Sequence, residues 1–125
     1  MTAAVHWRDI PAADWTWPHF TPAEMACRGT GEILVVPALL DLLEQLRDKL
    51  GRPLAINCAY RSALHNARVG GAPMSLHKFG KAADVALGQH DKADLIAAAR
   101  AVGFTGIGQT YASFVHFDLG PRRQW

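Results

Sequence analysis

Two imidazoles and one carboxylate stand where they could share a single divalent ion. His77 and Asp84 belong to the stretch SLHKFGKAAD at residues 75–84, and His116 follows in the segment FVHFD at residues 114–118. Three protein ligands of these types leave a fourth position for water, which is the arrangement of catalytic rather than structural zinc. Imidazole and carboxylate without thiolate fit zinc, and ligand type alone also admits other divalent ions.

The three side chains meet only if two strands carry them on a common face. Side chains alternate along a strand, so an extended segment 82–87 would point Asp84 away from its apolar neighbours. The same alternation over 114–119 would send His116 and Asp118 to the face of Asp84, with His77 arriving from the preceding loop. The apolar face would consist of Ala83, Val85, Leu87, Val115, Phe117 and Leu119. A helix through 77–84 is the alternative, and it would make His77 and Asp84 a surface pair.

The other elements indicate an α+β fold with a small sheet. The clearest helix spans residues 37–50, where one buried stripe is expected, and Gly51 suits a left-handed C-cap. That stripe consists of Leu39, Leu42, Leu43, Leu46 and Leu50. Further helices are expected at 91–102, from Ser62 through residue 68, and after a capping box that begins at Thr21. A short strand is expected at 54–58.

We expect residues 1–125 to form one domain, because 125 residues are enough for one and too few for two. Residues 1–20 hold three tryptophans and read as an irregular arm packed on the core, since tryptophan is costly to leave in solvent. The formal net charge of +2 gives little support for nucleic-acid binding.

Membrane insertion is not expected. The longest uncharged apolar run has eight residues, 33–40, whereas a transmembrane helix needs about twenty. The first residues show no apolar segment typical of a signal peptide. Cys27 and Cys58 form no C-x-x-C pair, and both a disulfide and two buried thiols remain open.

The order of the motifs resembles the zinc D-Ala-D-Ala carboxypeptidase-like peptidoglycan peptidases, which share the Hedgehog/DD-peptidase fold within the LAS group of metallopeptidases. The motif S-x-H-x-x-G-x-A-x-D is preceded by Tyr60, Arg61 and Ser62 and followed by F-V-H-x-D-x-G-x-x-x-x-W. The resemblance runs from about residue 20 to residue 125. It implies a small central, mostly antiparallel sheet flanked by helices, and one Zn2+ held by His77, Asp84 and His116.

The resemblance also implies roles around the ion. Many relatives carry Glu or Asp three residues before the last ligand, where this chain has Ser113. Asp118 is the candidate general base, because residues i and i+2 of a strand face the same side and Asp118 lies two residues after His116. Its rival role is to orient His116. Arg61 is expected to bind the substrate carbonyl or carboxylate and to stabilise the oxyanion, unless it forms an ion pair with a nearby Asp.

Two further residues are candidates for substrate binding. Ser75 could hydrogen-bond a ligand or the substrate, and it could equally be a plain loop cap. Tyr111 could donate a hydrogen bond to the substrate or simply pack at the rim of the cleft.

The function implied by the resemblance is zinc-dependent hydrolysis of peptide bonds in bacterial peptidoglycan, involving D-amino-acid-containing stem or cross-link peptides. The protein would act as an endolysin or cell-wall hydrolase at the cell wall or periplasm, either phage-encoded and released through a holin or held in the host cytoplasm before release. We expect a monomer whose partner is the peptidoglycan peptide. The alternative is a non-catalytic zinc-containing module of the same fold for peptidoglycan binding or assembly, and Ser113 keeps it open.

Overall fold

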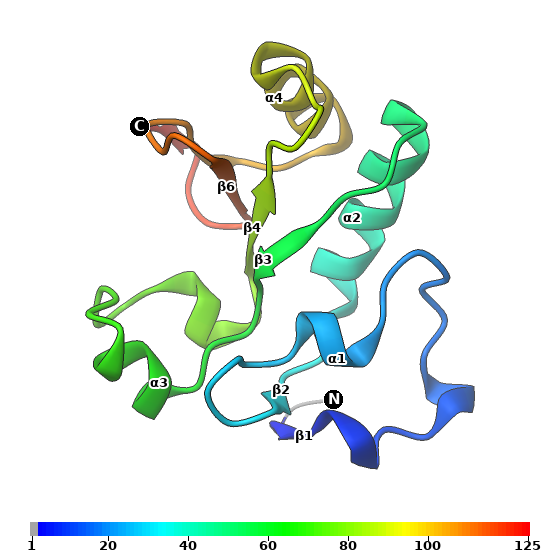
Figure 1. The fold of residues 1–125 in the computed structure, drawn as a ribbon, viewed down its shortest axis with the longest axis vertical. Coiled ribbons are helices and arrows are strands. Elements are labelled where there is room, and N and C mark those ends of the chain that lie inside the picture. The colour runs from blue at the N-terminus through cyan, green and yellow to red at the C-terminus, as the bar shows by residue number, and fades with distance from the viewer. Residues whose placement is uncertain (1–2) are drawn as a thin grey trace.

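A five-stranded sheet, ordered β3-β4-β6-β5-β7, carries both the core and the candidate site (Figure 1). The structure is a computed structural model that describes residues 3–125. The strands are β3 (Ile56–Cys58), β4 (Ala82–Ala86), β5 (Gly106–Gly108), β6 (Phe114–Asp118) and β7 (Arg123–Gln124). Every neighbouring pair is antiparallel except β5 and β7, which run parallel. The predicted α+β fold with a mostly antiparallel sheet is confirmed.

The predicted helices form close to their expected bounds. They are α1 (Pro22–Met25), α2 (Pro37–Leu50), α3 (Ala63–Arg68) and α4 (Lys92–Val102). The capping box of Thr21 and Glu24 starts α1, and Gly51 ends α2 with a φ of 65°. Within residues 3–125, none of the helices combines the length and the apolar character needed to cross a membrane.

The N-terminal arm is more ordered than the sequence predicts. Strand β1 (Val5–His6) pairs antiparallel with β2 (Glu32–Ile33), and two short 3-10 helices follow β1. Trp17 is buried, and its indole N–H donates to Asp41 on α2 at 2.8 Å. The first two residues of the arm lie outside the described part of the chain.

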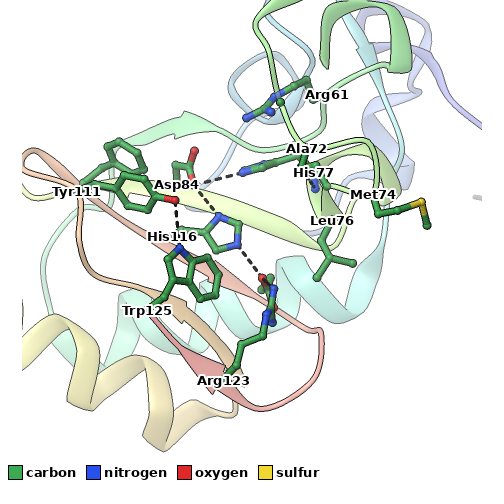
Figure 2. Close-up of a pocket in the computed structure, with 14 residues that line it drawn as sticks. Arg61, Ala72, Met74, Leu76, His77, Asp84, Tyr111, His116, Arg123 and Trp125 are labelled. Atoms are coloured by element: carbon green, nitrogen blue, oxygen red, sulfur yellow. Dashed lines mark hydrogen bonds and ion pairs between the residues drawn. The ribbon is translucent and has the colours of Figure 1, made fainter. Parts of the chain in front are cut away.

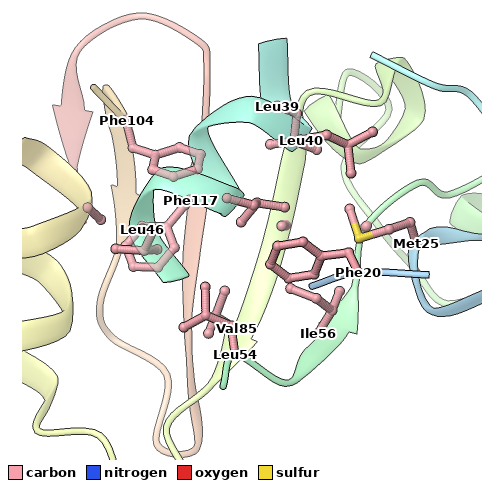
Figure 3. Close-up of a cluster of buried hydrophobic side chains, with 14 of the residues drawn as sticks. Phe20, Met25, Leu39, Leu40, Leu46, Leu54, Ile56, Val85, Phe104 and Phe117 are labelled. Carbon is pink, nitrogen blue, oxygen red and sulfur yellow. The ribbon is translucent and has the colours of Figure 1, made fainter. Parts of the chain in front are cut away.

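The hydrophobic core lies between one face of the sheet and the helices α2 and α4. Figure 3 shows core side chains from the strands, from α2 and from the segment before α1 gathered in one cluster. The strand residues on this face are Ile56, Ala83, Val85, Ile107, Val115 and Phe117, all buried. The buried stripe of α2 differs from the expected one. Leu40 is fully buried, whereas Leu42 and Leu50 are only partly buried. Leu40 is covered from the side of α1 and β2, where it lines a small cavity with Met25 and Ile33.

Candidate metal centre

Strand register places the first two candidate ligands side by side. Asp84 on β4 lies directly opposite His116 on β6, as the predicted alternation requires. Cys58 on β3 is opposite Asp84 on its other side, and Gly108 on β5 is opposite His116. Because paired residues send their side chains to the same face, this row crosses four strands on the face away from the core.

His77 reaches the same face from the short 3-10 helix Leu76–Phe79 that precedes β4. The hydroxyl of Ser75 caps this helix by accepting the backbone N–H of His77 at 3.3 Å. Gly80 ends it with a φ of 68°, and a Cβ there would lie 2.9 Å from the carbonyl oxygen of Leu34. Both the backbone angle and the space therefore call for glycine.

The two rings present opposite nitrogens to Asp84. His77 donates its Nδ1–H to the carbonyl of Ala59 at 2.7 Å, so its Nε2 faces Asp84 Oδ1 at 3.3 Å. His116 directs Nδ1 to the same oxygen at 3.0 Å and Nε2 to Asp118 Oδ2 at 2.7 Å. The centroids of the His77 and His116 rings are 5.1 Å apart, and the rings meet edge to face. Figure 2 shows both rings directed toward Asp84.

The spacing of the Asp84 carboxylate from each histidine nitrogen fits a small divalent ion. Ligand atoms bound tetrahedrally to zinc at about 2.0–2.1 Å lie about 3.3 Å from one another. The two distances from Asp84 Oδ1, 3.3 Å to His77 and 3.0 Å to His116, are close to that value. His77, Asp84 and His116 are all buried and come from three different elements.

Cys58 is a further potential ligand that sequence reasoning did not consider for this site. Its sulfur and donor atoms of His77 and Asp84 all lie within 4.8 Å of one another. However, Sγ lies 3.7 Å from Nδ1 of His77, the nitrogen that already donates to Ala59. His116 instead adds a nitrogen beside Asp84 Oδ1, so we favour His77, Asp84 and His116 as the ligand set. Cys58 lies here because β3 pairs with β4 and places Cys58 opposite Asp84. No local sequence pattern reveals this pairing.

The two cysteines are free thiols. Cys27 is buried, and its sulfur contacts the hydroxyl of Ser62 at 3.7 Å, whereas Cys58 is half-buried beside His77. Burial raises the pKa of Cys58, but hydrogen bonds from His77 and Arg61 outweigh burial and lower the pKa below its usual value. The sequence left open a disulfide or two thiols, and the structure shows two separate thiols.

The charged groups of the site stabilise one another. Burial lowers the pKa of His77, but its hydrogen bonds to Asp84 and Cys58 outweigh burial and raise the pKa to about 9. Burial also opposes the charge on His116, whose hydrogen bonds to Asp118 and Asp84 nevertheless raise its pKa. For Asp84, hydrogen bonds from both histidines overcome the effect of burial and lower the pKa to about 2. A metal ion must displace protons to bind these nitrogens.

Asp118 is held by four hydrogen bonds. Its carboxylate is fully buried and accepts both terminal nitrogens of Arg123, at 2.9 and 2.7 Å, and the backbone N–H of Gly120 at 2.9 Å. The fourth bond joins Oδ2 to His116. Burial raises the pKa of Asp118, but the bonds to His116 and Arg123 outweigh it and hold the pKa well below its usual range. These contacts favour the orienting role of Asp118 over that of general base.

A cavity of about 400 Å³ opens over the site, and the other candidate residues line it. Arg61 donates to Asn66 at 2.8 Å and to Cys58 Sγ at 3.5 Å, and within residues 3–125 it forms no ion pair with an acid. Tyr111 lies at the rim, where it stacks on Phe114 at 4.4 Å. Ser113 is exposed and lies outside the cavity lining. Among the described residues, the carboxylates that line the cavity are those of Asp84 and Asp118.

Comparison with known proteins agrees with this geometry. Residues 18–118 match the model of a family described as Peptidase M15, and this range includes His77, Asp84 and His116. The chain is also 41% identical over 88 residues to the zinc D-Ala-D-Ala carboxypeptidase of Streptomyces albus G. That alignment covers 66% of this chain and 34% of the relative, so the chain spans about a third of the relative's length.

Proposed function

Because this chain belongs to the Peptidase M15 family, we propose that it is a zinc peptidase that hydrolyses peptide bonds in bacterial peptidoglycan. The observation that carries the proposal is the Asp84 carboxylate between two histidine nitrogens at the floor of a cavity. The likeness to a zinc D-Ala-D-Ala carboxypeptidase supports the choice of metal and substrate. With this substrate, the site of action in our proposal is the bacterial cell wall.

His77, Asp84 and His116 would hold the ion through Nε2, a carboxylate oxygen and Nδ1, respectively. When bound with an open position, zinc lowers the pKa of water toward neutrality and polarises a carbonyl group. The backbone carbonyl of Ala59 and the carboxylate of Asp118 hold the remaining ring nitrogens, which fixes the orientation of both imidazoles.

Arg61 would bind the substrate carbonyl or its terminal carboxylate. Its guanidinium lines the cavity, and Asn66 holds one of its nitrogens at 2.8 Å. A fork anchored in this way is suited to an oxyanion, because the donors need little reorganisation when charge develops. Tyr111 would supply a second donor at the rim, since its oxygen accepts from the indole of Trp125 at 3.2 Å and keeps its own proton available.

Mass analysis of peptidoglycan fragments before and after digestion tests the proposal. The zinc-loaded protein should cleave stem or cross-link peptides, and the products distinguish removal of a terminal residue from internal cleavage. His77→Ala should abolish cleavage, and His19→Ala is the matched control because His19 is exposed and lies outside the cavity lining. Full cleavage after exhaustive removal of metal would refute a zinc mechanism.

A non-catalytic module is the second candidate, favoured by the exposed Ser113 and by the full engagement of Asp118. The same digestion separates the two functions. A protein that binds zinc and peptidoglycan fragments but leaves every peptide intact would be a binding module.

A further inference from the structure

Strand β7 and the residue that follows it send two side chains, those of Arg123 and Trp125, across β5 to the candidate metal centre. Strand β7 pairs with β5 and has no direct pairing with β6, which carries His116 and Asp118. Gly106 on β5 is opposite Asp118 on one side and Arg123 on the other. The guanidinium of Arg123 therefore crosses over Gly106 to reach the carboxylate of Asp118.

The space for this crossing depends on glycine. A Cβ at position 106 would overlap both the carboxylate of Asp118 and the guanidinium of Arg123. The next outward-facing residue of β5, Gly108, plays the same part for Trp125, whose ring a Cβ there would approach to 2.8 Å. Figure 2 shows Arg123 and Trp125 next to each other, close to His116.

Arg123 and Trp125 also contact each other, and Trp125 contacts His116. The guanidinium of Arg123 lies 4.8 Å from the centroid of the Trp125 ring, within range of a cation–π interaction. The Trp125 ring in turn lies 5.2 Å from the His116 ring. The two side chains thus form one packed unit against the face of His116 and its partner Asp118.

A buried carboxylate must be paired, and its pairing decides where it points. Asp118 is fully buried, and Arg123 supplies two of its four hydrogen bonds in the fork geometry that fits a carboxylate. Without that fork, only the N–H of Gly120 and the His116 ring would hold the carboxylate. It could then rotate, and the ring would lose a fixed acceptor at Nε2.

We propose that Arg123 is a positioning residue for the metal centre: it holds Asp118 so that Nε2–H of His116 stays bonded and Nδ1 faces the ion. Gly106 belongs to the same device, because it provides the passage for the guanidinium. This inference rests on the proposed function, since it assigns the device to the metal site of a zinc peptidase.

Zinc affinity and the ring signals of His116 test the inference without recourse to hydrolysis. Arg123→Gln removes the fork, and we expect zinc binding about 10–100-fold weaker, the usual effect of losing an outer partner of a ligating histidine. Arg123→Lys keeps the positive charge but cannot form the two-pronged fork, so its loss of zinc affinity should be smaller than that of Arg123→Gln. Gly106→Ala should resemble Arg123→Gln. The control is Arg122→Gln, because Arg122 is exposed and lines no part of the site.

Nuclear magnetic resonance supplies the second readout. In the zinc-bound protein the Nε2–H proton of His116 should give a slowly exchanging signal, and Arg123→Gln should broaden or remove it. Thermal unfolding of each metal-free variant separates misfolding from a local effect. If Arg123→Gln lowers thermal stability but keeps both zinc affinity and the ring signal, Arg123 has only a structural role and the inference is wrong.

The same measurements separate this inference from the proposed function. A wild-type protein that binds zinc but cleaves no peptide would refute the peptidase proposal, and the variants would still decide the role of Arg123. A wild-type protein that binds no zinc would overturn both.

Discussion

The two faces of β4 and β6 are built from alternating residues of the same strands, yet they are stabilised by different interactions. Val85, Val115 and Phe117 on the core face are fully buried hydrocarbon. Asp84, His116 and Asp118 on the opposite face are almost as buried, and each is held by hydrogen bonds and ion pairs. Among residues 3–125, no buried side-chain nitrogen or oxygen lacks a partner.

This difference predicts two kinds of response to substitution. Hydrophobic stabilisation is proportional to the area buried, so loss of volume on the core face should reduce the free energy of unfolding. A carboxylate beside two imidazoles gains little net stability from its charges, because desolvation opposes their attraction. Imidazoles left without the carboxylate avoid an unpaired buried charge by losing their protons. Substitutions on the site face should therefore weaken metal binding more than they weaken the fold.

The largest effect is expected for Asp84→Ala. This change removes the oxygen that both histidines face, at 3.3 and 3.0 Å. Zinc binding should weaken by more than the roughly 100-fold loss typical of an outer partner, while the metal-free variant stays folded. Competition with a chromophoric chelator measures the affinity. Asp48→Ala is the matched control because Asp48 is exposed on α2, and an equal loss in the control would refute the assignment.

On the core face, Phe117→Ala should reduce the free energy of unfolding by about 3–5 kcal/mol. The ring is fully buried and lies 5.3 Å from that of Phe104, so truncation leaves a cavity between sheet and helices. Denaturant titration of the metal-free protein measures the change. Leu64→Ala should stay within about 0.5 kcal/mol, because Leu64 is 57% exposed. A loss below about 1 kcal/mol for Phe117→Ala would contradict the two-face comparison.

A pH effect should be confined to the site face. The pKa of His77 is raised to about 9 and that of His116 is also raised, so each imidazole keeps its proton to a higher pH than a free imidazole does. Zinc competes with these protons, and its affinity should fall with decreasing pH by about tenfold per unit for each proton displaced. Zinc titration calorimetry in buffers of different ionisation enthalpy counts the released protons. Release of no proton at pH 7 would show that these nitrogens do not bind the ion.

The features that the sequence predicts well depend on neighbours along the chain. The helix over α2, the capping box at Thr21 and the alternation in β4 and β6 follow from local patterns, and the structure shows each of them. The stripe of α2 was only partly predicted, because Leu40 is buried whereas Leu42 and Leu50 are partly buried. Because alternation assigns faces to residues, it was enough to predict that Asp84 and His116 point the same way.

The features that could not be predicted depend on which strands become neighbours. Cys58 reaches the site only because β3 pairs with β4, and Arg123 reaches Asp118 only because β7 joins β5 in parallel. Pairing partners of two- or three-residue strands leave no periodicity in the sequence, and the same holds for β1 and β2 in the arm. A glycine that leaves space for a distant side chain, such as Gly106, looks like any other glycine until the register is known.

The smallest effect is expected for Ile107→Val, and it tests whether the two faces respond independently within one strand. Ile107 is 1% exposed and faces the core between Gly106 and Gly108, which face the site. Loss of one methylene should cost about 0.5–1.5 kcal/mol of unfolding free energy. Zinc affinity should change by less than about twofold, because no atom near the ligands moves out of contact. Parallel denaturant and zinc titrations measure both quantities. A zinc affinity that falls as far as in Gly106→Ala would mean that β5 transmits core packing to the metal centre, and the faces would then be one coupled unit.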